Sequence, residues 1–152
     1  MAKVFKPVLQ KCKGYFAWTN NETEPLRPAN CLCLNCQGCG DGDADGCPHE
    51  QAIMDMCAEN DLRVAVSRCP VWQGSAKSRI AAVRETHHGL PVLVSPALEQ
   101  VRREQCLCLN CAKCKPGESD HCFMAAGLYR LCLRGNLAMV ITRCPEWEPK
   151  KK

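Results

Sequence analysis

The sequence predicts an α+β protein made of two small, tandem, cysteine-rich modules that are stapled by metal and joined by a helical connector. Three observations lead to this fold class. The 152 residues include 15 cysteines and few aromatic side chains, so aliphatic burial alone is a thin basis for stability. The cysteines recur in two copies of one spaced pattern. Each copy continues into a helical segment and then an alternating, strand-like one.

The duplication has an offset of 75 residues. The seven cysteines of the first copy each return in the second, the sets being Cys31, Cys33, Cys36, Cys39, Cys47, Cys57, Cys69 and Cys106, Cys108, Cys111, Cys114, Cys122, Cys132, Cys144. Residues 31–72 and 106–147 share 16 of 42 positions without a gap. Aliphatic positions differ between the copies and no cysteine does, so we expect all seven to have a chemical role. Cys12 stands outside the repeat.

This repeat divides the chain into five parts. We predict an N-terminal extension at 1–30, a first module at 31–72, a connector at 73–105, a second module at 106–147 and a basic tail at 148–152. Residues 1–30 and 76–105 show no convincing identity. The sequence therefore demonstrates the duplication only for the cysteine modules.

Each module is expected to contain a cysteine-rich loop, a helix and a strand. Pro48 near a helix start predicts a helix over 47–59, and Gly135-Asn136 ends the matching helix over 122–134. Alternating apolar residues predict strands over 62–67 and 137–142, and a short strand over 31–34. In the connector, 78–87 is predicted to be a helix ended by Gly89, 90–94 an extended piece, and Ser95-Pro96 the start of another helix.

The helix leaves the cysteine loop and the strand returns to it, so the helix start and the strand end should meet. Cys57 lies ten residues beyond Cys47, about 15 Å along a helix, too far to share one ion with it. We therefore predict one four-thiolate site in each module, formed by Cys36, Cys39, Cys47, Cys69 and by Cys111, Cys114, Cys122, Cys144. Cys33 and Cys108 lie between the two ends and are further candidate ligands.

The opposite end of each module is expected to hold a pair of thiols. These pairs are Cys31 with Cys57 and Cys106 with Cys132. In an oxidising setting each pair could form a disulfide, whereas in the cytosol we expect reduced thiols that pack beneath the strand.

The run Cys36-Gln-Gly-Cys39-Gly40 resembles the zinc knuckle, in which two thiolates grip one ion and a following glycine eases the turn. This resemblance implies Zn²⁺, two ions per chain. Lys115 replaces the glycine in the second copy. Cys33, Cys36 and Cys39, with the remote Cys69-Pro70, also resemble the ligand run of bacterial ferredoxins, which implies a [4Fe–4S] cluster as the alternative.

Other polar residues are expected to be structural. The four histidines, His49, His87, His88 and His121, do not recur at the offset, so we expect surface residues rather than ligands. Arg68 and Arg143, and Trp72 and Trp147, are retained in both copies. We expect their side chains to donate hydrogen bonds to loop carbonyls and to cover the small core.

The formal net charge of +4 falls to about zero if each of two four-thiolate zinc sites carries −2, which weakens the charge argument for nucleic acid. No nucleophile elbow, phosphate loop or His-Glu-x-x-His motif occurs. We therefore expect a non-catalytic structural-zinc adaptor that presents a surface to protein or nucleic acid. The alternatives are an iron–sulfur electron-transfer or redox-sensing protein, and a disulfide- or metal-stapled component of a larger assembly.

Basic residues gather on two predicted helices and in the tail. They are Lys77, Arg79 and Arg84 on one helix, Arg102 and Arg103 on another, and Lys150, Lys151 and Lys152. They form either solvated faces or a phosphate-binding surface. No secretory signal and no apolar run long enough to span a bilayer are evident, so we expect a cytoplasmic protein without membrane contact. No small-molecule substrate is evident.

Overall fold

The computed structural model describes residues 5–12, 15–37, 49–76 and 78–150, and it shows a mixed α+β fold around a six-stranded antiparallel sheet. The strands are β1 (Val8–Cys12), β2 (Tyr15–Thr19), β3 (Arg63–Cys69), β4 (Val83–His87), β5 (Leu90–Val94) and β6 (Ala138–Cys144). The α-helices are α1 (Arg27–Asn30), α2 (Glu50–Asn60), α3 (Pro96–Gln105) and α4 (Phe123–Gly135). Short 3₁₀ helices are η1 (Glu24–Leu26), η2 (Cys33–Asn35) and η3 (Cys108–Asn110).

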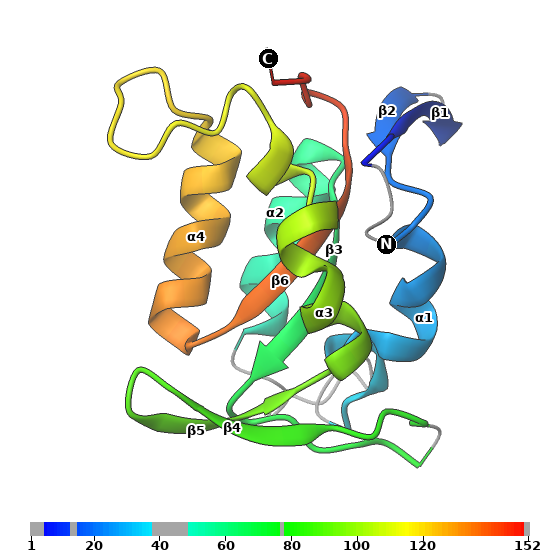
Figure 1. The fold of residues 1–152 in the computed structure, drawn as a ribbon, viewed down its shortest axis with the longest axis vertical. Coiled ribbons are helices and arrows are strands. Elements are labelled where there is room, and N and C mark those ends of the chain that lie inside the picture. The colour runs from blue at the N-terminus through cyan, green and yellow to red at the C-terminus, as the bar shows by residue number, and fades with distance from the viewer. Residues whose placement is uncertain (1–4, 13–14, 38–48, 77, 151–152) are drawn as a thin grey trace.

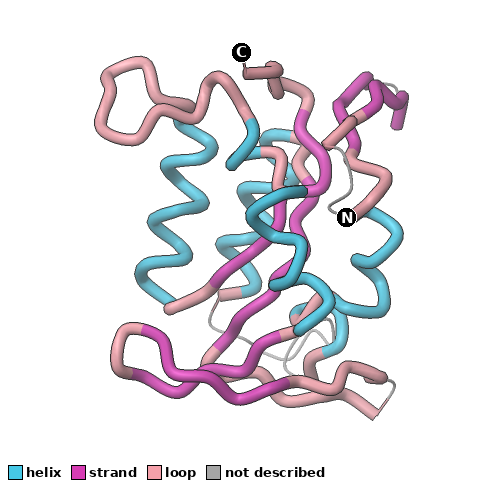
Figure 2. The backbone as a smooth tube through the Cα atoms, in the orientation of Figure 1, coloured by secondary structure: helices cyan, strands magenta, loops and turns pink. Residues whose placement is uncertain are grey.

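The order of strands in the sheet is β1-β2-β6-β3-β5-β4. The long strands β3 and β6 cross the middle of the molecule, and the β1–β2 and β4–β5 hairpins flank them at opposite ends (Figure 1). The backbone tube shows the same arrangement of the strands (Figure 2). β3 and β6 therefore form the centre of the fold.

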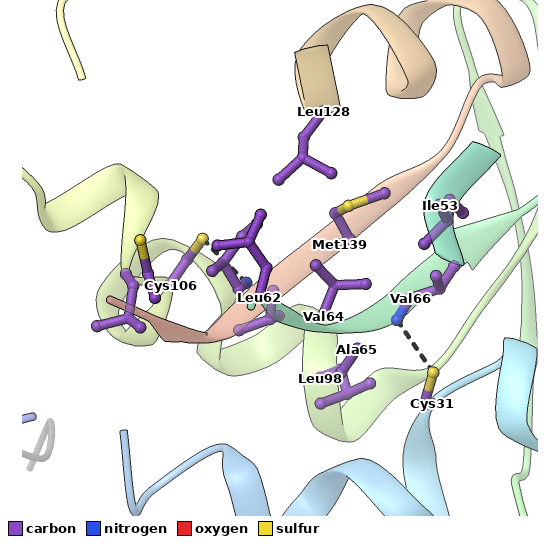
Figure 3. Close-up of a cluster of buried hydrophobic side chains, with 14 of the residues drawn as sticks. Cys31, Ile53, Leu62, Val64, Ala65, Val66, Leu98, Cys106, Leu128 and Met139 are labelled. Carbon is purple, nitrogen blue, oxygen red and sulfur yellow. Dashed lines mark hydrogen bonds between the residues drawn. The ribbon is translucent and has the colours of Figure 1, made fainter. Parts of the chain in front are cut away.

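Helices cover both faces of the two central strands. Figure 3 shows Leu128 of α4 and Ile53 of α2 on the side toward which Met139 and Val64 project, and Leu98 of α3 on the side of Ala65. Every residue of β6 is buried, as expected for a strand packed on both faces. Fully burying one Val or Leu side chain contributes about 1.5–3 kcal/mol, so this layer supplies a large share of the stability.

The duplication extends beyond the cysteine modules. β1 and β2 lie 75 positions before β4 and β5, and the pairing registers match: Val8 faces Thr19 as Val83 faces Val94. The 75-residue offset therefore covers both hairpins, although their sequences have diverged.

The two copies exchange their hairpins. β2 of the first copy pairs with β6 of the second, and β5 of the second pairs with β3 of the first. The hydrogen bonds repeat this exchange, since the Asn20 N–H donates to Thr142 O at 3.0 Å and the Ser95 N–H to Ser67 O at 2.8 Å. Ala65 pairs with Val140, its own equivalent, so a local twofold axis passes between them.

The carboxylates of Glu24 and Glu99 are equivalent residues that join the two copies in the same way. Glu24 accepts a hydrogen bond from Thr142 Oγ1 at 2.9 Å, and Glu99 accepts one from Ser67 Oγ at 2.6 Å. Each glutamate belongs to one copy and each hydroxyl to the other. The exchange is therefore secured by side chains as well as by strand pairing.

The helices and strands expected within the modules are confirmed as α2, α4, β3 and β6, with ends shifted by a few residues. Asn136 ends α4 in the left-handed conformation, at φ 53°, and Asp61 does the same for α2. The α2–α4 packing is close: a Cβ on Gly135 would lie 2.6 Å from the His49 ring. The start of the predicted helix, at Cys47 and Pro48, lies outside the described residues.

Two expected elements are wrong. Residues 31–34 form no strand, because Cys33–Asn35 turns as η2 and the Asn35 side chain donates to Cys31 O. The helix predicted over 78–87 is absent, since Val83–His87 is strand β4. His88 and Gly89, at φ 55° and 77°, make the two-residue turn that hairpins favour. The connector is therefore a hairpin followed by one helix, α3, which confirms the helix expected at Ser95-Pro96.

The hairpin exchange predicts that the two halves of the chain depend on each other. Cut between Ser75 and Ala76, the fragments should associate one to one and recover the circular dichroism of the whole chain. The reason is that β3 and β6 each take a neighbouring strand from the other half. Sedimentation of separate and mixed fragments checks this. A folded, monomeric single fragment would contradict the exchange.

Candidate metal centre

Six of the eight predicted ligands lie among the described residues, and Cys39 and Cys47 lie outside them. In the first copy this leaves Cys36 and Cys69, both buried, at 9% and 4% exposure. Cys36 forms an isolated bridge with Gly74, and Cys69 ends β3. The complete predicted quartet lies among the described residues only in the second copy.

In the second copy, five cysteines line one small cavity. They are the four predicted ligands Cys111, Cys114, Cys122 and Cys144, together with Cys108. The volume of the cavity is about 20 Å³, and most of its other walls are apolar side chains, including Leu107, Leu128 and Trp147. Cys108 was predicted only as a further candidate ligand. The Cys-x2-Cys-x2-Cys spacing of Cys108, Cys111 and Cys114 is the sequence signal that indicates it.

Three elements bring these cysteines together. Cys108 begins η3, Cys122 caps the start of α4, and Cys144 ends β6. Backbone bonds turn the loop sharply between them: the Cys114 N–H donates to Cys111 O at 3.2 Å, and the Cys122 N–H to Lys113 O at 2.9 Å. The helix start and the strand end therefore meet at the loop.

The first copy contributes to this cavity through Leu62, which immediately precedes β3 and forms part of its wall. On the second copy's side, the Trp147 Nε1–H donates to Asn110 O at 3.1 Å and holds the segment after β6 against the loop. The cavity thus lies where the two copies meet. Sequence reasoning missed Leu62, because its place depends on the pairing of distant strands.

The cavity thiols lie in an environment that disfavours bare thiolates. Burial raises the pKa of Cys108 well above its ordinary value, with the nearby Cys106 and Cys144 adding to the effect. Burial also raises the pKa of Cys144 to about 11, with Cys111 and Cys122 contributing. A bound cation would reverse this preference by stabilising the thiolates, and its binding would release protons.

The cysteines that line the cavity do not form a metal-binding group. In the part of the chain that the structure describes, no three His, Cys, Asp or Glu side chains are grouped so as to hold one metal ion. The donor set itself is sulfur, in a mostly apolar wall, which is the composition of structural zinc and iron–sulfur sites.

The outer cysteines do not line this cavity, although Cys106 lies near Cys108. Cys31 and Cys106 are buried at 2% exposure, while Cys57 and Cys132 on the helices are half-buried. The Val66 N–H donates to Cys31 Sγ at 3.3 Å, and the Ile141 N–H to Cys106 Sγ at 3.4 Å (Figure 3). None of the cysteines whose side chains are described forms a disulfide.

The expected bonds of the repeated tryptophans and of Arg68 are confirmed. The Trp72 Nε1–H donates to Leu32 O at 2.8 Å, and Arg68 Nη2 donates to Leu137 O at 3.2 Å. The Arg143 guanidinium forms an ion pair at 2.9 Å with Asp61 of the other copy.

The histidines are less exposed than expected. His88 is exposed, while His49, His87 and His121 are partly buried. Burial lowers the pKa of His49, and His121 Nδ1 accepts a hydrogen bond from the Lys115 N–H at 2.7 Å. These contacts give His121 a role in holding the cysteine loop.

No protein-family model, curated protein or solved structure matches this chain. Among the described residues, every helix is too short or too polar to cross a bilayer.

The alkylation rate of the Cys132 thiol should reflect its buried environment. Burial raises its pKa to about 11, with Cys106 adding to the rise against the opposing Arg68 and Arg102. Since the thiolate is the reactive form, alkylation of Cys132 at pH 8 should be about 10- to 100-fold slower than in unfolded protein. Peptide mass spectrometry after timed iodoacetamide treatment measures the rate.

The pH dependence of the alkylation rate distinguishes the raised pKa of Cys132 from steric shielding of its thiol. In folded protein the rate at Cys132 should still rise about tenfold per pH unit between pH 9 and 10, whereas in urea it should level off near pH 9. A plateau near pH 9 in folded protein would contradict the raised pKa.

Proposed function

We propose that the protein is a non-catalytic metal-binding protein in which each copy holds one structural zinc ion in cysteine thiolates. The observation that carries the proposal is the cavity lined by Cys108, Cys111, Cys114, Cys122 and Cys144. Zinc in structural sites takes four ligands in a tetrahedron, and a full set of thiolates leaves no open position for catalysis. The predicted quartet of Cys111, Cys114, Cys122 and Cys144 would supply them.

The size and the walls of the cavity support a single ion. A volume of about 20 Å³ holds one body the size of a water molecule, which suits one ion better than an eight-atom cluster. Bound there, zinc would tie the loop to the start of α4 and the end of β6. It would stabilise a junction that otherwise depends on Leu62, Leu107 and a few backbone bonds.

The first copy supports the proposal through the repeat. Cys36 and Cys69 are buried and equivalent to Cys111 and Cys144. Cys39 and Cys47 are equivalent to Cys114 and Cys122 at the same offset, and they complete the quartet of the first copy in the sequence. We therefore propose two zinc ions per chain.

An iron–sulfur protein is the second candidate, and a specific observation favours it. Cys108, Cys111 and Cys114 line the cavity together with Cys144, which Pro145 follows. This is the ligand set that the ferredoxin resemblance implies. In this case each copy would hold a [4Fe–4S] cluster, and the function would be electron transfer or redox sensing.

Metal analysis of protein purified without oxygen tests both candidates. We expect a colourless protein with two zinc ions per chain. Cys111→Ser should lose about one ion and partly unfold the second copy, because metal binding and folding are one equilibrium. Cys132→Ser is the matched control, since Cys132 is absent from the cavity lining, and it should keep both ions.

The outcomes separate the candidates. Brown protein with iron and sulfide would favour the iron–sulfur function. Full metal content in Cys111→Ser, or no metal in the wild type, would overturn the cavity as a metal centre.

We propose a protein rather than a nucleic acid as the partner of this adaptor. The loop lysines are neutralised, since Lys113 pairs with Glu146 at 3.1 Å and Lys115 with Asp120 at 2.8 Å. The helix expected to align Arg79 and Arg84 is absent, and Arg84 lies on β4. Large apolar side chains are exposed on α2 and α4, namely Met54, Phe123, Tyr129 and Leu133. Aromatic side chains and Met are enriched at protein interfaces.

A binding assay with random-sequence single-stranded and duplex DNA and RNA at low salt checks the partner class. We expect no binding to any of these probes by the wild-type, metal-loaded chain. Binding that weakens with salt, and that Arg79→Ala with Arg84→Ala reduces, would overturn the preference for protein. Glu59→Ala, which removes an acidic residue of α2, serves as a control for general charge effects.

A further inference from the structure

The β1–β2 hairpin of the first copy docks on the strand end that carries a candidate ligand of the second copy. Trp18 of β2 is the cross-strand partner of Cys144, and Thr19 is the partner of Arg143. Residues directly opposite each other in an antiparallel pair project from the same face of the sheet. The side chains of Trp18 and Cys144 are therefore neighbours at the end of β6, where Figure 1 shows the hairpin.

The Trp18 ring also contacts a wall of the thiol cavity. Its centroid lies 5.2 Å from that of Trp147 in an edge-to-face arrangement, and the Phe5 ring contacts Trp147 in the same way at 5.6 Å. Edge-to-face aromatic pairs add stability beyond that of the area they bury. Trp147 lines the cavity beside Cys144, and its Nε1–H donates to Asn110 O of the cysteine loop. The hairpin thus supports both a candidate ligand and the wall next to it.

A buried polar contact joins the end of the hairpin to the start of the same loop. The Asn20 side-chain amide donates to Gln105 O at 2.7 Å and to Gln105 Oε1 at 3.0 Å, and both residues are almost fully buried. Gln105 ends α3, three residues before Cys108. Leaving such buried groups unpaired is costly, so this contact opposes undocking. The hairpin therefore holds the two segments, loop and strand end, that a zinc ion in the cavity would join.

The first copy has the same pairing with different side chains. Leu93 of β5 is the cross-strand partner of Cys69, so each hairpin docks against the last cysteine of the other copy's central strand. At the 75-residue offset, Leu93 stands for Trp18 and Ile80 for Phe5. The docking position is thus a property of the duplicated fold, whereas aromatic side chains occupy these two positions only beside the second site.

We propose that the β1–β2 hairpin, through Trp18, is a positioning element of the second copy's metal centre, so that zinc binding and hairpin docking stabilise each other. This inference rests on the proposed zinc-binding function and adds an element that regulates the second site. A docked Trp18 holds Cys144 and Trp147 in place before the ion arrives, which lowers the cost of ordering them on binding. By thermodynamic linkage, the ion strengthens hairpin docking by the same factor. Zinc in the second site thereby controls whether the hairpin stays on β6.

Competition with a chromophoric chelator in oxygen-free buffer tests the proposal on the whole, zinc-loaded chain. Alkylation of Cys36 and Cys111, followed by peptide mass spectrometry, reports the zinc occupancy of each site, because bound thiolates react slowly. Trp18→Leu gives the second site the first copy's side chain and should lower its zinc affinity about 10- to 100-fold, with the first site unchanged. Trp18→Phe keeps an aromatic ring and should restore most of this affinity. Phe16→Leu, at an exposed ring of the same strand, is the matched control and should change neither site.

Amide hydrogen exchange measures the reciprocal effect on the hairpin. Cys111→Ser, which removes the second ion, should speed exchange in the peptide that contains Thr19 and Asn20. Cys36→Ser, which removes the first ion, should speed it much less. Equal exchange in the two variants would contradict the coupling.

The outcomes separate the inference from the function on which it rests. A wild type with two zinc ions whose second site binds equally well in Trp18→Leu would overturn the inference and leave the zinc function standing. A wild type without zinc would overturn both. If circular dichroism shows that Trp18→Leu does not fold, Phe5→Ile replaces it, and a smaller loss of affinity at the second site is expected.

Discussion

The antiparallel pairing of β3 with β6 is the constraint on which the rest of the fold depends. Ala65 and Val140, both 0% exposed, face each other at the local twofold axis, and each strand comes from a different copy. Once these strands pair, their outer edges accept the hairpins, and α2 and α4 are brought together on one face. The wall that Leu62 forms at the second copy's thiol cavity follows from the same pairing. A hydrophobic strand pair thus places a cavity lined by cysteines.

The cysteines of each copy fall into two environments. The same spacing pattern produces both environments in each of the two copies. Those that meet at the loop line an apolar cavity, where burial opposes thiolate formation unless a cation is present. The outer pairs lie beside backbone N–H groups and an arginine, at the edge of the central strands. The helix between Cys122 and Cys132 separates the two environments along its axis. This separation places two groups of cysteines in one short module.

The sequence was informative where periodicity reports burial directly. The α2, α4, β3 and β6 segments have clear apolar patterns, and the meeting of Cys122 with Cys144 follows from helix and strand lengths. The β4 strand was missed because it is an exposed edge: Arg84 and Glu85 interrupt any alternation, and only His88-Gly89 marks the turn. The hairpin exchange was beyond reach, because strand partners far apart in the chain leave no local signal. Cys108 was placed between two groups because its segment was expected to run as a strand toward the loop, whereas Cys108–Asn110 turns as η3.

The position of β6 has a consequence for how the chain acquires its structure during synthesis. The first hairpin, β1–β2, has β6 as its neighbour in the sheet, and β6 leaves the ribosome after the other described strands. Domains commonly fold from the N-terminus as they emerge, but here β2 waits for β6. The N-terminal half therefore emerges with its sheet edge and several thiols uncovered.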